Sequence, residues 1–268
     1  VRGERAIYNF KRHCIEKSLY GVDIDSGAVE IAKLRLWLSL VVDEDDIKNI
    51  KPLPNLDYKI VCGNSLLGVE KNLFNDAMFK ELEDLKHRLF DETNPTKKQE
   101  YKNQIDNLIS KITDGHKEFD YEVYFSEVFH TTSNSPFGKG GAGGFDVVIA
   151  NPPYINTNEM KDYADLYRNL YSTAYGSYDI YVLFFEKSIN LLHENAILTF
   201  ITSNKFFIAD YAKKLRSLLL NKVNILKLLD LADCKQVFES VLVSPSITII
   251  KKQKVTDYLL EIGLLKDE

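Results

Sequence analysis

The sequence predicts an α/β protein built on a doubly wound, mostly parallel sheet. Short apolar runs typical of strands alternate with segments of helical periodicity along most of the 268 residues. A polar residue stands at the carboxyl end of three of these runs: Asp23, Asn64 and Asn151. Ligands of open α/β sheets bind outside the carboxyl ends of the strands, so these three residues mark a candidate site.

Composition narrows the function classes. A formal net charge of −5 argues against a wholly basic nucleic-acid binder, but it permits an enzyme with its positive charge on one face. The three cysteines lie far apart in the sequence and predict neither a zinc site nor a disulfide framework, which suits a reducing cytoplasm. No apolar run approaches the roughly 20 residues that span a bilayer, and no signal peptide is evident, so we expect no membrane partner. The chain starts at Val1 rather than Met, and we expect it to be a piece of a longer protein.

The first elements form a strand–helix–strand pattern. Residues 19–24 are a short apolar run ending in acid, which predicts a buried strand. Helical periodicity begins at Ser26, which we expect to be the N-cap. Residues 58–62 predict a second strand that stops at Gly63 and Asn64.

Residues 70–118 differ from the rest of the chain. Apolar residues recur at spacings of three and four on both sides of Asn94-Pro95: Phe74, Met78, Leu82, Leu85 and Leu89 before it, and Tyr101, Ile105, Leu108 and Ile112 after it. The spacing predicts two amphipathic helices folded as a hairpin, with the proline opening the second. Because the charges are mixed in sign, we interpret the hairpin as a solvated insertion within one domain that spans residues 1–268.

Strands and helices alternate again in the second half. Residues 145–150 predict a strand that ends in Asn151-Pro152-Pro153-Tyr154. The pattern then predicts a helix over 179–193, a strand over 196–202, a helix over 206–220, a strand over 225–230 and a final strand over 245–251.

Asn151-Pro152-Pro153-Tyr154 is the strongest chemical signal. Two prolines after a buried strand fix an extended turn and remove two amide donors, so carbonyl oxygens can be held toward a ligand. The oxygens of Asn151 and Pro152 can accept both hydrogens of an exocyclic amine, and Tyr154 offers a stacking platform for a planar ring. Asp23 can accept hydrogen bonds from ribose hydroxyls, and Asn64 can reach an adenine amino group. A helix-capping or solvated acid and a turn asparagine remain the alternatives for these two.

The segment 145–154 resembles the catalytic motif of amino-group DNA methyltransferases that use S-adenosylmethionine. Residues 20–25, 28–38, 63–67 and 201–207 are similar, in order and spacing, to one branch of these enzymes. That branch is the N6-adenine methylases of bacterial restriction–modification systems, often fused with a nuclease. The resemblance covers residues 15–70 and 120–252 and implies a Rossmann-like methyltransferase fold that acts on an adenine flipped out of double-stranded DNA.

The resemblance also implies roles for single residues. Asp23 would bind the ribose of S-adenosylmethionine, Ile24 would pack on its adenine, and Asn64, with Ser65 beside it, would contact the adenine edge. Asn151 and Pro152 would hold the target amine, while Tyr154 and Tyr211 would stack on the target base. Apart from the resemblance, the basic segment 205–222 contributes the candidates for DNA phosphate contacts, which are Lys205, Lys213, Lys214 and Arg216. The alternative for these four is an ordinary solvated helix face.

One expected feature of the family has no counterpart here. Residues 1–18 contain no glycine-rich cofactor loop, so we expect the first strand, that loop and most of the following helix to lie upstream of Val1. The regions that recognise the DNA sequence, and any nuclease, would lie elsewhere in the parent polypeptide, and we expect residues 1–268 alone to be inactive. Two alternatives stay open: a methyltransferase acting on RNA or a protein glutamine, and a non-catalytic DNA-binding module of a restriction assembly.

Overall fold

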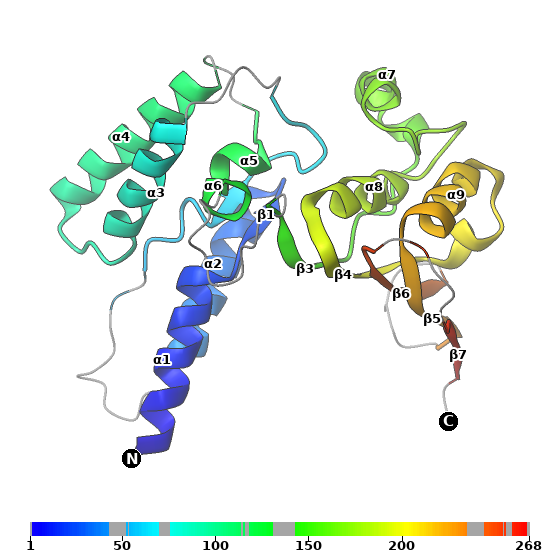
Figure 1. Ribbon diagram of the computed structural model, residues 1–268, viewed down its shortest axis with the longest axis horizontal. Coiled ribbons are helices and arrows are strands. Elements are labelled where there is room, and N and C mark those ends of the chain that lie inside the picture. Colours follow the sequence, from blue (N-terminus) through cyan, green and yellow to red (C-terminus); the bar gives the residue numbers. More distant parts are fainter. Residues whose placement is uncertain are drawn as a thin grey trace. The chain divides into compact units, whose positions relative to one another are not determined.

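The computed structural model describes residues 2–42, 52, 54–69, 76–113, 115, 118–130, 143–234, 244–253, 255 and 259–266. The chain divides into two compact units, Val1–Pro136 and Phe137–Glu268, and each is described by itself. Both units combine helices with strands, so the predicted α/β class is confirmed (Figure 1). That both units belong to one catalytic domain stays a prediction. Among the described helices, none is both long and apolar enough to cross a bilayer.

Unit 1 opens with a helix and a parallel strand pair. Helix α1 (Arg2–Lys17) precedes β1 (Gly21–Asp23), α2 (Ser26–Val41) and β2 (Ile60–Cys62). Strands β1 and β2 pair in parallel, with Asp23 opposite Cys62. A shared apolar core joins these elements and consists of Tyr8, Ile15, Val29, Leu40, Leu56, Ile60 and Phe90. Helix α1 thus occupies residues where the sequence analysis expected only the end of a helix.

The N-cap of α2 differs from the expectation. Asp25, not Ser26, takes the extended backbone of a cap, and its side chain accepts a hydrogen bond of 2.7 Å from the Ala28 amide. Ser26 is therefore the first helical residue. A carboxylate is a better acceptor than a hydroxyl for the free amides of a first turn, because it also interacts favourably with the helix dipole.

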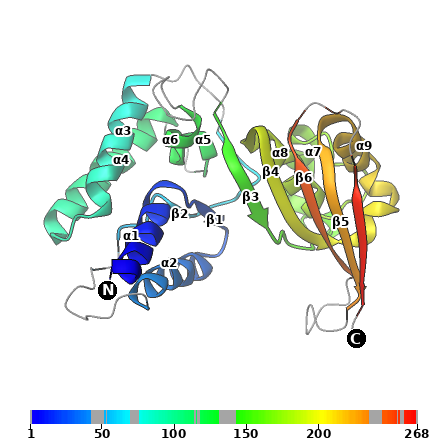
Figure 2. The same ribbon diagram turned by 60° about the horizontal axis from the view of Figure 1, so that its bottom comes forward.

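Two further helices of unit 1, α3 (Asp76–Phe90) and α4 (Pro95–Ile112), lie side by side (Figures 1 and 2). They correspond to the two predicted amphipathic segments, and Asn94 caps α4 ahead of Pro95. Their facing sides share a core with the short helix α5 (Tyr121–Tyr124), and α6 (Ser126–Phe129) follows. Phe74 and the rest of residues 70–75 lie outside the described part. That the pair is an insertion stays a prediction.

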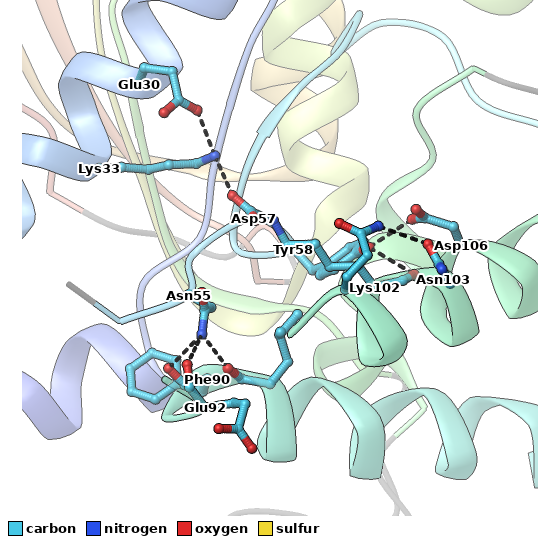
Figure 3. A network of polar contacts seen from close by, with 12 residues as sticks. Glu30, Lys33, Asn55, Asp57, Tyr58, Phe90, Glu92, Lys102, Asn103 and Asp106 are labelled. Carbon is cyan, nitrogen blue, oxygen red and sulfur yellow. Dashed lines mark hydrogen bonds and ion pairs between the residues drawn. The ribbon is translucent and has the colours of Figure 1, made fainter. Parts of the chain in front are cut away.

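A polar network ties the segment before β2 to three helices (Figure 3). Asp57 accepts hydrogen bonds from Lys33 of α2 at 2.8 Å and forms an ion pair with Lys102 of α4 at 2.5 Å. The Asn55 amide donates to carbonyls at the carboxyl end of α3, among them that of Glu92 at 3.0 Å. Burial tends to raise the pKa of Asp57, but the hydrogen bonds and charges of Lys102 and Lys33 outweigh it and lower that pKa. The network therefore fixes the segment that leads into β2.

Unit 2 contains a five-stranded sheet in the order β3-β4-β6-β5-β7. Its strands are β3 (Phe145–Ala150), β4 (Leu192–Ser203), β5 (Asn224–Asp233), β6 (Pro245–Lys251) and β7 (Glu261–Lys266). Strand β3 pairs with β4 in parallel and β5 with β7 in parallel, whereas β6 runs antiparallel to both β4 and β5. The sheet is thus mixed rather than mostly parallel, and β7 was not predicted.

Helices α8 (Tyr181–Leu191) and α9 (Lys213–Lys222) pack against β4 and β5 and cover one face of the sheet (Figure 2). The predicted helix over 206–220 is broken into two 3₁₀ turns, Asn204–Phe207 and Asp210–Ala212, followed by α9. The break follows from packing, because Phe206 is buried beside Phe185 of α8 and Ala212 is buried as well. Tyr211 consequently lies on a turn, not within a helix.

Candidate active site

The Asn-Pro-Pro-Tyr motif follows β3 directly, at the carboxyl end of the strand. Asn151 is exposed, Pro152 is buried, and Tyr154 is half-buried. The Tyr154 hydroxyl lies 3.1 Å from Asn151 Oδ1 and 3.4 Å from the carbonyl oxygen of Ile201 in β4. A carboxamide oxygen has two lone pairs, so the contact with Tyr154 orients the Asn151 side chain and leaves the oxygen able to accept a second hydrogen.

Three tyrosines from separate segments meet beside the motif. The rings of Tyr154 and Tyr181 are 6.2 Å apart in an edge-to-face arrangement, at an interplanar angle of 88°. The hydroxyls of Tyr181 and Tyr211 are 2.8 Å apart, and the Tyr211 hydroxyl donates to Asp179 Oδ2 at 2.8 Å. Tyr181 must be the donor to Tyr211, because Tyr211 uses its single hydrogen on a carboxylate that only accepts.

Burial governs the ionisation of these tyrosines. Desolvation raises the pKa of Tyr154, Tyr181 and Tyr211 above the ordinary phenol value, and in Tyr211 the hydrogen bond to Asp179 raises it further. The three hydroxyls are therefore protonated at neutral pH and act as hydrogen-bond donors. A planar ring beside Asn151 would meet neutral aromatic faces and edges.

The predicted phosphate contacts differ in exposure. Lys205, Lys213 and Lys214 are exposed, and the Lys214 amine lies 5.3 Å from the centre of the Tyr175 ring. Arg216 is half-buried and donates to the backbone carbonyls of Phe206 and Ala209 at 3.0 and 2.7 Å. Arg216 thus holds the turn that carries Tyr211, and a phosphate contact would have to use its other N–H groups.

The predicted cofactor residues lie in unit 1. Asp23 ends β1 and is exposed; its Oδ1 accepts a hydrogen bond of 2.8 Å from the Asp25 amide, which leaves Oδ2 with no bond to the residues that the structure describes. Ile24 follows Asp23 directly and is 74% exposed. An acceptor for a ribose diol therefore stands next to an apolar surface for a ring.

Asn64 and Ser65 form the loop after β2. Asn64 Oδ1 accepts a hydrogen bond of 2.9 Å from the Leu66 amide, and the Ser65 side chain is hydrogen-bonded to Tyr121. Gly63 allows the loop to pack tightly, because a Cβ at this position would lie 2.4 Å from the Cβ of Phe119. The turn role of Asn64 matches the alternative considered from the sequence, and contact with an adenine edge stays a prediction.

The structure brings some predicted residues together and adds others. Asn151, Tyr154 and Tyr211 belong to one cluster in unit 2, whereas Asp23, Ile24, Asn64 and Ser65 belong to unit 1. Sequence reasoning missed Asp179 and Tyr181, which connect Tyr211 to Tyr154. The sequence did offer one signal, because Asp179 and Tyr181 both stand at the start of the predicted helix over 179–193. Over the described ranges no group of three potential metal ligands gathers.

Comparison with known proteins identifies the family of the chain. The sequence profile of the Eco57I restriction-modification methylases matches residues 17–238, which include the Asn-Pro-Pro-Tyr motif. The chain belongs to this methylase family. Methylases of this family take their methyl group from S-adenosylmethionine. That Asp23 and Ile24 hold its nucleoside part stays a prediction.

Individual relatives are much longer than this chain. It is 29% identical to RM.MjaORFECS2P of Methanocaldococcus jannaschii, over 94% of the chain but 27% of that protein. It is 27% identical to the type II restriction enzyme and methyltransferase RM.Eco57I of Escherichia coli, over 87% of the chain and 18% of that protein. The DrdV–DNA complex superposes with a TM-score of 0.55 at 13% identity, covering 98% of this chain and 23% of that one, which shows a shared fold.

Proposed function

We propose that the protein containing this chain is a DNA methyltransferase of a restriction–modification system, which methylates N6 of adenine. The observation that carries the proposal is the exposed Asn151 at the carboxyl end of β3, with the ring of Tyr154 beside it and buried Pro152 after it. An acceptor pair next to an aromatic face suits a planar amine. Membership of the methylase family supports methyl transfer as the reaction.

The chemistry explains the residue types. The N6 lone pair of adenine is delocalised into the ring and is a poor nucleophile. Asn151 Oδ1 and the Pro152 carbonyl would accept the two amine hydrogens and so favour a tetrahedral nitrogen with an aimed lone pair. S-adenosylmethionine supplies an electrophilic methyl group when bound. Transfer would join this methyl group to N6 in place of its bond to sulfur, and the amine held by Asn151 and Pro152 would then release one proton to solvent.

An adenine inside a duplex must first leave the stack, at a cost of a few kcal/mol. Aromatic stacking is worth about 1–3 kcal/mol per base, which offsets much of that cost. Tyr154 and Tyr211 are the candidate stacking partners, and both are neutral phenols at physiological pH. Their separate segments would let them approach a planar ring from different directions.

Charge near the cluster supports a DNA substrate. Lys213 and Lys214 occupy the first turn of α9, where the helix dipole disfavours cations. Helix stability thus gives no reason for two lysines there, whereas phosphate binding does. We further propose that the remaining length of the protein supplies sequence recognition and a nuclease, since RM.Eco57I is named as both restriction enzyme and methyltransferase, and that it acts in the bacterial cytoplasm.

The test uses the full-length protein with isotope-labelled S-adenosylmethionine and unmethylated duplex DNA. After digestion to nucleosides, mass spectrometry should find the label in N6-methyladenine. Label in N4-methylcytosine would change the target base, and label found in RNA or protein would change the substrate class. Absence of transfer to DNA, RNA and protein alike would refute the proposed reaction and favour a non-catalytic DNA-binding module.

A further inference from the structure

Asp179 joins three segments of unit 2 that are distant in sequence. Its Oδ1 accepts a hydrogen bond of 2.9 Å from Asn156, two residues beyond the motif, and its Oδ2 accepts one of 2.8 Å from Tyr211. Asp179 itself stands just ahead of α8 and pairs with Asn156 in an isolated antiparallel bridge. One half-buried carboxylate therefore satisfies donors from the segment after β3 and from the turn before α9.

The surrounding bonds make this junction rigid. The Thr157 amide donates to the Tyr178 carbonyl at 2.9 Å, and the Ile180 amide donates to the Ile155 carbonyl at 2.8 Å. Asn156 Oδ1 in turn accepts from the Ser177 hydroxyl at 3.0 Å. The backbone after the Asn-Pro-Pro-Tyr motif is thus hydrogen-bonded to the segment that leads into α8.

Tyr181 connects this junction with the Asn-Pro-Pro-Tyr motif. It lies two residues after Asp179, is fully buried, donates to the Tyr211 hydroxyl, and packs its ring edge-to-face with that of Tyr154. Packing alone does not explain the hydroxyl of Tyr211, since a phenylalanine ring would fill the same space. A buried hydroxyl chain that ends on a carboxylate is costly unless every member is satisfied, and here each one is.

We propose that Asp179 is a positioning residue for methyl transfer: it holds Tyr211 and, through Asn156, the Asn-Pro-Pro-Tyr segment at the separation that receives the flipped base. This proposal rests on the proposed function. In this proposal Asp179 acts through its hydrogen bonds with Tyr211 and Asn156, and not by contact with the base or the cofactor. A displacement of about 1 Å in such a site can reduce the rate about 100-fold.

The experiment compares variants of the full-length protein in steady-state and single-turnover methyl transfer. Asp179→Ala removes both acceptor oxygens, and we expect its kcat to fall about 10- to 100-fold with the KM for S-adenosylmethionine changed less than about two-fold. Asp179→Asn keeps one acceptor oxygen and should recover part of the loss. Asp165→Ala is the matched control, because its carboxylate is 94% exposed and its ion pair is with Arg168 of the same helix, α7 (Lys161–Leu170).

Tyr211→Phe supplies a test that does not depend on the folding of the alanine variant. It keeps the ring and removes the hydroxyl, so we expect a several-fold loss of kcat, and the double variant Asp179→Ala/Tyr211→Phe should be little worse than Asp179→Ala. Multiplied effects in the double variant would overturn the proposal, as would a parallel rise in the cofactor KM or a kcat equal to that of Asp165→Ala. A wild-type protein that transfers no methyl group would instead refute the proposed function itself.

Discussion

Replacing Glu127 by glutamine removes the carboxylate that lies between two buried lysine amines in unit 1. Glu127 pairs with Lys86 at 3.1 Å and with Lys59 at 3.5 Å, and these side chains are 15%, 9% and 14% exposed. Desolvation lowers the pKa of both lysines, that of Lys59 to about 8, although Glu127 raises it. The ammonium of Lys59 also lies 3.8 Å from the centre of the Tyr20 ring.

The expected loss follows from the charges left behind. Removing one partner of a buried ion pair costs about 3–5 kcal/mol, because the other charge remains buried. In the variant, Lys59 can limit its share by releasing its proton. Its pKa of about 8 includes the raising effect of Glu127, so without Glu127 deprotonation at pH 7 costs less than about 1.4 kcal/mol. We therefore expect Glu127→Gln to lower the free energy of unfolding by about 3 kcal/mol, or Tm by roughly 6–12 °C.

Differential scanning calorimetry of Glu127→Gln and the exposed control Glu81→Gln measures this loss. The folded pKa of Lys59, about 8, lies below its unfolded value of 10.5, so the stability that this group contributes to wild type rises with pH only above about 8. Without Glu127, which raises the pKa of Lys59, the folded pKa is lower, and in the variant the same rise begins at a lower pH. The deficit of the variant should accordingly shrink from pH 7 to pH 9. Equal Tm values for Glu127→Gln and Glu81→Gln would refute the reasoning.

Three further predictions concern the two sites. Gly63→Ala should lower stability by about 1–3 kcal/mol through overpacking against Phe119, and an unchanged Tm in calorimetry would contradict the tight loop. Tyr154→Ala should weaken binding of DNA with a flipped target base by about 1–3 kcal/mol while Tyr154→Phe keeps most of the affinity; equal affinities would exclude stacking by the ring. The double variant Lys213→Ala/Lys214→Ala should reduce the slope of log affinity against log salt concentration by about 1.8, as measured by fluorescence anisotropy. The control is Lys222→Ala, and equal slopes for the two variants would show that neither Lys213 nor Lys214 contacts a phosphate.

Local patterns in the sequence predicted much of the fold. Apolar spacing located α3 and α4, and Pro95 located the start of α4, because both signals act within a few residues. Strand β7 was missed because Gly263 interrupts its apolar run, and glycine is disfavoured in strands. The direction of β6 was also beyond a local pattern, since antiparallel and parallel pairing use the same alternation of residues.

The candidate site divides in the same way. Asn151 and Tyr154 were predictable because their chemistry is compressed into four residues after a strand. Asp179 and Tyr181 were not, because their partner Tyr211 is 32 and 30 residues away and only tertiary packing brings them together. The expected continuous helix over 206–220 also concealed the turn that places Tyr211, since helical periodicity alone does not reveal the burial of Phe206.

The role of Asn151 is the central claim, and single-turnover methyl transfer by Asn151→Ala in the full-length protein tests it most directly. The matched control is Asn221→Ala, which removes an exposed amide at the far end of α9. Loss of one acceptor that strengthens in the transition state predicts a rate about 100- to 1000-fold below wild type with DNA affinity retained, whereas Asn221→Ala should keep the wild-type rate. A rate for Asn151→Ala within a few fold of Asn221→Ala would contradict the account.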